Sequence, residues 1–116
     1  THDFNAFKNK KSFFSMTAHI IYNQIDPTNP ATHSKKIIRL IRDKLVFKNL
    51  IMSDDISMKA LKFNIVKNTK LAFTAGCNLV LHCNGNLSEM TLVAKNSPLI
   101  DKFILKKTYK FYNIIS

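Results

Sequence analysis

Residues 50–58 read LIMSDDISM, and this stretch decides the predicted fold. Three apolar residues run directly into two adjacent carboxylates, Asp54 and Asp55, and residues 57–61 that follow are compatible with a helix. This order is typical of a buried strand whose carboxyl end leads into a helix. In parallel α/β folds, ligands bind beyond the carboxyl ends of the strands, so the two acids stand where catalytic side chains project. The structural alternative is that Ser53 or Asp55 merely caps the following helix.

Two further apolar runs, at residues 12–19 and 79–81, are predicted strands that also end in polar side chains. The first ends at His19, the strand of residues 47–53 ends at the acids, and the third is followed by His82 and Asn84. Helices are predicted from Ser34, at residues 69–75 with Gly76 as a left-handed cap, at residues 88–95 and from Pro98. Strand then helix, repeated at intervals of about 25 to 35 residues, predicts βαβ crossovers in a parallel sheet.

The length of the chain limits how much of such a fold it can form. A (β/α)8 barrel requires roughly 250 residues, and this chain has 116. Three βα units would therefore be less than half of such a barrel. The chain also begins with Thr1 rather than Met, which predicts a fragment or a processed product.

The chain is strongly basic, with a formal net charge of +11. All but two of its 18 basic residues are Lys, the exceptions being Arg39 and Arg42. Proteins that recognise nucleic acids rely on bidentate Arg contacts and on aromatic side chains that stack on bases, and neither pattern is evident here. We therefore expect a solvated basic surface and no nucleic-acid partner. The alternative is a nonenzymatic basic binding module that uses the lysines of residues 8–11 and 102–110 to bind phosphate.

The cysteines and apolar runs indicate a reduced, soluble chain. Cys77 and Cys83 have neither the spacing nor the second ligand pair of a zinc site, so no metal and no cofactor are expected. No apolar run approaches the ~18 residues of a membrane helix, and no signal peptide is visible. We therefore expect no membrane association and a cytoplasmic location.

Four blocks of sequence carry a family resemblance. They read MTAHIIY at residues 16–22, IDP and PAT at residues 25–27 and 30–32 followed by Ser34, MSDDISM at residues 52–58, and AGCNLVLHCNG at residues 75–85. In this order and spacing they resemble successive blocks of the bacterial β-N-acetylhexosaminidases of glycoside hydrolase family 3. The resemblance implies that residues 1–116 are the C-terminal portion of a (β/α)8 TIM-type catalytic barrel whose N-terminal portion is missing.

The resemblance also implies an activity. Members of this family are cytoplasmic exo-enzymes that remove terminal β-linked N-acetylglucosamine from anhydro-muropeptides in peptidoglycan recycling. Asp54 matches the nucleophile, which attacks the anomeric carbon and forms a glycosyl-enzyme that water hydrolyses with net retention. Asp55 is expected to hold the following turn. His19, Met52 and Asn84 are candidate rim residues for substrate.

For each rim position a structural role competes with a functional one. His19 is expected to be a hydrogen-bonded residue of the pocket wall rather than a catalytic group. In the same structural interpretation, His82 and Asn84 only shape the rim, and Met16 and Met52 are expected to fill the barrel interior.

The departures from the family are informative too. Its acid/base loop, Asp-Ser-His, and its sugar-binding Lys-His-Phe-Pro-Gly-His-Gly block do not occur. Residues 46–49 read VFKN in place of the usual Gly-Phe-Asp-Gly, which makes any left-handed backbone there costlier. Asn78 replaces a usual Asp.

A nucleophile without a proton donor predicts that the isolated chain is inactive, because a general acid typically contributes about 100- to 10,000-fold to the rate. The expected partners are a muropeptide substrate and the missing part of the barrel. The remaining alternative is a nonfunctional remnant of the enzyme.

Overall fold

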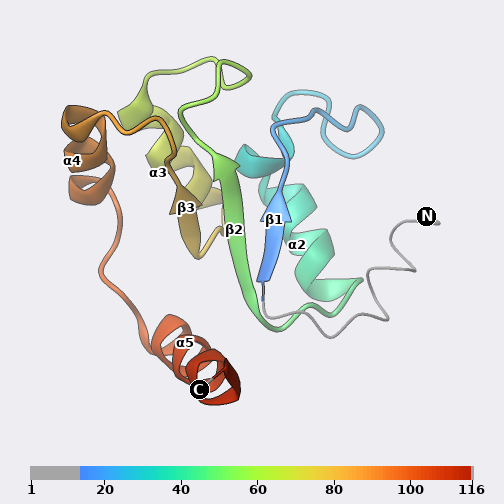
Figure 1. The fold of residues 1–116 in the computed structure, drawn as a ribbon. Helices are drawn as coiled ribbons and strands as arrows, with labels where there is room; N and C mark the ends of the chain where they lie inside the picture. Colours follow the sequence, from blue (N-terminus) through green and yellow to red (C-terminus); the bar gives the residue numbers. More distant parts are fainter. Residues whose placement is uncertain (1–13, 116) are drawn as a thin grey trace.

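The computed structural model describes residues 14–115, in which strands and helices alternate along the chain (Figure 1). In chain order the elements are β1 (Phe14–Thr17), the short 3-10 helix η1 (Ala31–His33), α2 (Lys35–Asp43), β2 (Leu50–Asp55), α3 (Ile65–Ala75), β3 (Leu79–Leu81), α4 (Leu87–Lys95) and α5 (Lys102–Ile115). The first two residues of the predicted strand 12–19 and the lysines of residues 8–11 lie outside the described residues.

The three strands form one parallel sheet in the order β1-β2-β3, as the sequence predicts. All three arrowheads point the same way in Figure 1, so the carboxyl ends of the strands share one edge of the sheet. β2 is the central strand: Met52 is level with Met16 of β1 and with Leu79 of β3, and the register with β3 shifts before Asp55. This is the arrangement of about three βα units of a TIM-type α/β barrel.

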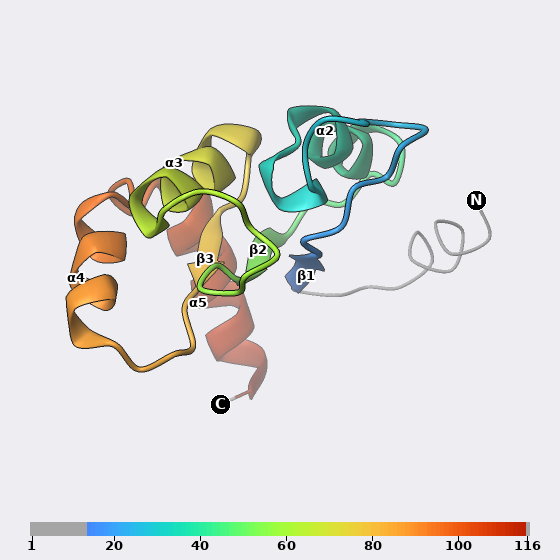
Figure 2. The ribbon, with the colours of Figure 1, turned by 90° about the horizontal axis from the view of Figure 1, so that it is seen from above.

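Helices α2 and α3 cover one face of the sheet and lie next to each other (Figure 2). The core beneath them is centred on Ile51 of β2, which is fully buried against Ile38 of α2 and Ala72 of α3. Burying aliphatic side chains of this size stabilises a fold by about 1.5 to 3 kcal/mol each. The apolar residues at helical spacing on α2 therefore determine that this helix packs on the face of the sheet that carries Ile51.

The other face of β2 carries Leu50, Met52 and Asp54, because successive side chains of a strand alternate between faces. On the neighbouring strand, Met16 occupies the same register row as Met52 and is 55% exposed. In a closed barrel this face would line the interior, and the placement of Met16 and Met52 there stays a prediction.

One predicted helix is absent. Residues 56–64 form turns, and α3 begins only at Ile65, with the side chain of Asn64 accepting a hydrogen bond from the backbone N–H of Lys67. Neither Ser53 nor Asp55 is therefore a helix N-cap, and that alternative is wrong. The physical reason is that Asp55 binds the backbone two residues ahead and closes a turn, as short polar side chains often do.

Two residues near the amino ends of β2 and β3 have left-handed backbone. Gly76 ends α3 with φ 122°, as its position predicts, and an added Cβ would lie 2.8 Å from Cγ2 of Ile38. Val46 has φ 52°, although a β-branched residue is an outlier there. Residues 46–49 contain no glycine, and the costlier left-handed backbone that this predicts is present at Val46.

Candidate active site

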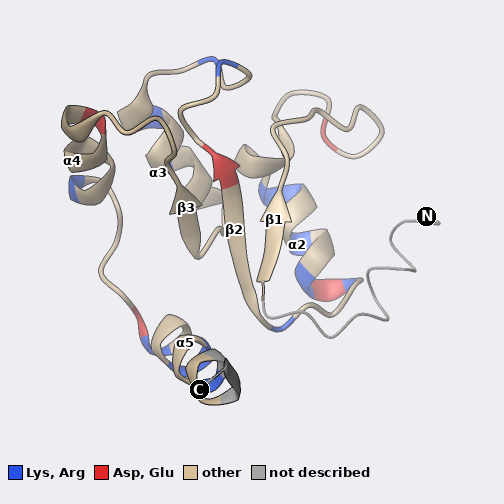
Figure 3. Cartoon of the chain, viewed as in Figure 1, with Lys and Arg blue, Asp and Glu red and all other residues tan. Residues whose placement is uncertain are grey.

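Asp54 stands at the carboxyl end of the central strand. The two acids form the red tip of β2 in Figure 3. The Asp54 side chain is half-buried, and its Oδ1 accepts a hydrogen bond of 2.8 Å from the backbone N–H of Asp55. No other hydrogen bond to this carboxylate is made by the described residues, so most of its acceptor capacity remains for a ligand.

Asp55 has the opposite arrangement, because its carboxylate is engaged on both sides. Oδ1 accepts hydrogen bonds from the backbone N–H of Ser57 at 3.0 Å, from the Ser57 hydroxyl at 2.7 Å and from the backbone N–H of Cys83 at 3.0 Å. Partial burial alone would raise the pKa of Asp55, but these hydrogen bonds and the nearby His82 outweigh it and lower the pKa. Asp55 thus holds the turn after β2, as the sequence predicts, and it also ties this turn to the end of β3.

His19 bridges the ends of β1 and β2. Its Nε2 donates a 2.7 Å hydrogen bond to the backbone carbonyl of Asp55, and its Nδ1 is 2.8 Å from the hydroxyl of Thr32. A carbonyl oxygen can only accept, so Nε2 carries a proton. The buried Thr32 hydroxyl also lies 2.9 Å from that of Thr17. Both ring nitrogens of His19 are therefore used within the protein, as the structural interpretation requires.

His82 and Asn84, beyond β3, are engaged with α4. His82 Nε2 and Asn84 Nδ2 lie 3.1 and 3.0 Å from Oε1 of Glu89, and the hydrogen bonds from both lower the pKa of that carboxyl. The His82 side chain is only 6% exposed, and its Nδ1 has no partner among the described residues. Glu89 was not predicted from the sequence; the available signal was its place three residues after the N-cap Asn86, a capping-box spacing.

Asp26 organises the long loop between β1 and α2, and the sequence analysis missed it. This buried carboxylate accepts hydrogen bonds from the Ser34 hydroxyl at 2.6 Å and from the backbone N–H groups of Thr28 and Asn29. The hydrogen bond from Ser34 is the main reason why the pKa of Asp26 falls from 3.8 to about 2. The dipeptide Asp26-Pro27 was the sequence signal for such a turn.

No group of three His, Cys, Asp or Glu side chains within residues 14–115 is arranged to hold a metal ion. Both cysteines are free thiols; burial raises the pKa of Cys77 to about 11, whereas Cys83 is exposed. None of the helices in the same range is long and apolar enough to cross a membrane. At this edge of the sheet the Asp54 carboxylate accepts one hydrogen bond from the described residues, whereas Asp55, His19 and His82 are bound by other groups.

Known proteins resemble this chain in sequence. Residues 4–108 match the family described as the glycosyl hydrolase family 3 N terminal domain. The chain is 37% identical over 83 residues to a β-hexosaminidase of Shewanella frigidimarina, which covers 69% of this chain and 24% of that protein. It is 40% identical over 91 residues to a β-hexosaminidase of Haemophilus influenzae, covering 72% of this chain and 26% of that protein.

A solved structure extends the likeness to the fold. The β-N-acetylglucosaminidase of Thermotoga maritima superposes with a TM-score of 0.66 at 27% sequence identity, over 90% of this chain and 25% of that one. The chain thus spans about a quarter of the length of these relatives. The parallel sheet, its helices and the sequence match agree: this chain belongs to glycoside hydrolase family 3, within the N-terminal barrel domain of that family.

Proposed function

We propose that this chain supplies the nucleophile of a retaining β-N-acetylhexosaminidase, with Asp54 as the attacking group. The position of Asp54 carries the proposal: it lies at the carboxyl end of the central parallel strand, and the described residues make one hydrogen bond to its carboxylate. An ionised carboxylate there can attack an anomeric carbon and form the glycosyl-enzyme. Names of relatives such as β-hexosaminidase support the choice of sugar.

The substrate we propose is an anhydro-muropeptide with terminal β-linked N-acetylglucosamine, handled in the cytoplasm during peptidoglycan recycling. His19, Met52 and Asn84 are the proposed rim. Met52 shares the face of Asp54 and is the one best oriented to contact a sugar, whereas His19 and Asn84 shape the rim through their hydrogen bonds.

The isolated chain is proposed to be inactive and to act with the rest of a barrel. Glycosidic cleavage needs a proton donor for the leaving group as well as a nucleophile. His19 uses both ring nitrogens within the protein, and Nδ1 of His82, which has no partner among residues 14–115, is buried. A donor from the remainder of the barrel is therefore part of the proposal.

The test is reconstitution. The chain is co-expressed with the N-terminal portion of a related β-hexosaminidase and assayed with a chromogenic N-acetylglucosaminide and with an anhydro-muropeptide. Asp54→Asn should lower turnover by more than about 1,000-fold, because the covalent route is lost. Asp43→Asn, on the exposed side of α2, removes the same charge and should retain full activity. Equal activity of wild type and Asp54→Asn would overturn the proposal.

A further inference from the structure

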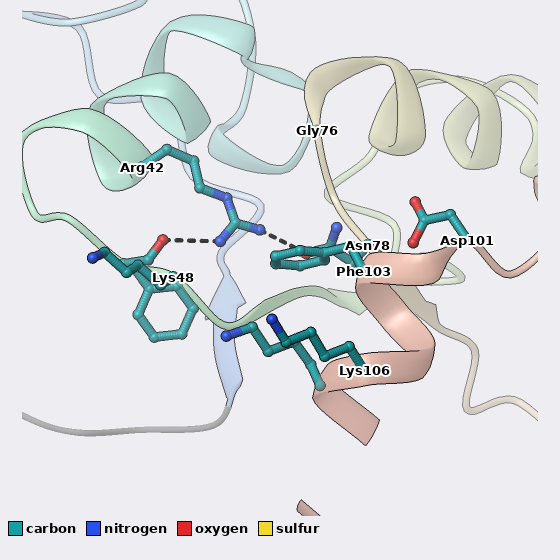
Figure 4. Close-up of a pocket in the computed structure, with 9 residues that line it drawn as sticks. Arg42, Lys48, Gly76, Asn78, Asp101, Phe103 and Lys106 are labelled. Atoms are coloured by element: carbon teal, nitrogen blue, oxygen red, sulfur yellow. Dashed lines mark hydrogen bonds between the residues drawn. The ribbon is translucent and has the colours of Figure 1, made fainter. Parts of the chain in front are cut away.

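A basic hollow lies at the opposite end of the sheet from Asp54. It has a volume of about 640 Å³ and lies between α2, the amino ends of β2 and β3, and the start of α5 (Figure 4). Its lining comprises Arg42, Phe47, Lys48, Gly76, Asn78, Asp101, Phe103, Lys106 and Lys107. The length of β2 separates it from the proposed nucleophile, so it is a different site.

Arg42 forms the fixed part of the hollow. Its Nη1 donates hydrogen bonds to the backbone carbonyls of Phe47 at 2.9 Å and Asn49 at 2.6 Å, and its Nη2 donates to Oδ1 of Asn78 at 2.7 Å. Its guanidinium carbon also lies 5.4 Å from the ring centre of Phe103 on α5. These partners orient the half-buried guanidinium but are all electrically neutral, so they leave its positive charge uncompensated.

Three lysines add to this charge. Lys48 precedes β2, and Lys106 and Lys107 project from α5; Figure 4 shows Arg42 and Lys106 reaching toward the same space from two helices. Burial, and then repulsion from neighbouring cations that include Lys106 and Lys48, lower the pKa of Lys107. The cations are therefore close enough to destabilise one another.

Little negative charge opposes them. Asp101 is the acidic residue of the lining, and its Oδ1 already accepts a hydrogen bond from the backbone N–H of Ile104 in the first turn of α5. Four cations and one carboxylate leave the lining with a net charge of +3. Folding has gathered repelling charges in a concave site, and an anion that binds there would relieve the repulsion.

We propose that this hollow binds a small molecule that carries a pyrophosphate group. A pyrophosphate presents several negative charges over two tetrahedral centres, which matches a site of this volume better than one carboxylate does. The flexible lysine ammonium groups make the direct contacts, and the immobilised Arg42 supplies a fixed field. The cations converge on one hollow rather than follow a line, which favours a compact anion over a nucleic-acid backbone.

The first experiment is calorimetric titration of the chain with inorganic pyrophosphate at low salt. Wild type should bind one equivalent. Lys106→Gln combined with Lys107→Gln should weaken binding by about tenfold or more, because two charge-assisted contacts are lost. The matched control combines Lys59→Gln with Lys62→Gln; these exposed lysines lie in the loop of residues 56–64, beyond the carboxyl end of β2, and the net charge is the same. The control should bind as wild type does.

A second variant tests the electrostatic contribution of Arg42 without removing a hydrogen bond. Asn78→Asp keeps the oxygen that accepts hydrogen bonds from Arg42 and from the backbone N–H of Ile51, so the fold is retained. The added negative charge beside Arg42 should weaken pyrophosphate binding several-fold. Circular dichroism of each variant verifies the fold.

A site-resolved readout accompanies the titration. Acetylation of lysines followed by mass spectrometry should show that pyrophosphate protects Lys106 and Lys107 and leaves Lys59 and Lys62 reactive. The proposal is overturned if no saturable binding occurs at millimolar pyrophosphate, if both double variants lose binding equally, or if single-stranded DNA binds through these lysines while pyrophosphate does not. Protection confined to Lys106 and Lys107 supports it.

Discussion

Replacing each of the two adjacent acids with Ala should affect stability very differently, although their charges are the same. Asp55→Ala removes the acceptor for three donors, namely the N–H and hydroxyl of Ser57 and the N–H of Cys83. Asp54→Ala removes one acceptor, for the N–H of Asp55. Asp55 should therefore matter for folding, and Asp54 should be nearly dispensable for it.

The magnitudes follow from the hydrogen bonds. A hydrogen bond contributes about 1 kcal/mol net, and one to a charged group more, but water replaces part of this at a half-exposed side chain. We therefore expect Asp55→Ala to lower the free energy of unfolding by about 2 kcal/mol and Asp54→Ala by about 0.5 kcal/mol. With a urea m-value of about 2 kcal/mol/M for a domain of this size, the midpoints should fall by about 1 M and 0.25 M.

The assay is urea unfolding of the chain followed by circular dichroism, with wild type and both variants measured at pH 7. Asp43→Ala on α2, a position with no hydrogen bond to its carboxylate within the described part of the chain, is the control. It should unfold at or slightly above the wild-type midpoint, because Asp43 ends the helix and Ala is the better helix former. If Asp54→Ala costs as much as Asp55→Ala, the division of the pair into a chemical and a structural acid is refuted.

Four further outcomes are expected. Val46→Gly should raise the free energy of unfolding by about 0.5 to 1 kcal/mol in the same assay, because relief of the strain at φ 52° exceeds the entropy cost of glycine and the side chain is 51% exposed. Gly76→Ala should lower it by about 2 kcal/mol or more, since Ala is strained at φ 122° and its Cβ meets a neighbour at 2.8 Å. Maleimide at pH 7 should label the exposed Cys83 and spare Cys77, whose pKa is about 11, until urea unfolds the chain. The stability that Asp26 contributes should be complete above pH 4 and disappear as the pH falls toward 2. In urea unfolding measured at a series of pH values, Asp26→Asn should therefore be less stable than wild type above pH 4, and this difference in the free energy of unfolding should vanish toward pH 2.

The elements of the fold were predictable where apolar residues run together. The run before Asp54 and the shorter run at residues 79–81 gave β2 and β3, and the helical spacing after Ser34 gave α2. These signals are local, because a buried strand or helix requires apolar residues at a regular spacing along one short segment. The helix expected after Asp55 does not form, and the reason is physical. The Asp55 side chain binds the backbone two residues ahead, which favours a turn over a helix, and composition alone does not distinguish the turn from the helix.

The connections within the site were not predictable, because they join residues far apart in the chain. His19 meets the carbonyl of Asp55 across 36 residues, and Asp55 meets the N–H of Cys83 across 28. Nothing in the local sequence distinguishes a His that binds a carbonyl from one that faces a substrate. The predicted strand ends identify which residues gather at the rim. The hydrogen-bond partner of each residue follows only from the three-dimensional structure.

The hydrogen bonds at the rim also bear on which chemistry it can perform. Asp55, His19 and His82 each have a partner within the described chain, whereas Asp54 keeps most of its carboxylate unused. The backbone N–H of Asp55 is the group within the described chain that binds the Asp54 carboxylate, and the hydrogen bonds of Asp55 and His19 fix the turn that carries this N–H. His19 uses both of its ring nitrogens in this way, so it is not free to donate a proton to a leaving group. In the proposed hydrolase, in which Asp54 is the nucleophile, the general acid would therefore come from another part of the barrel.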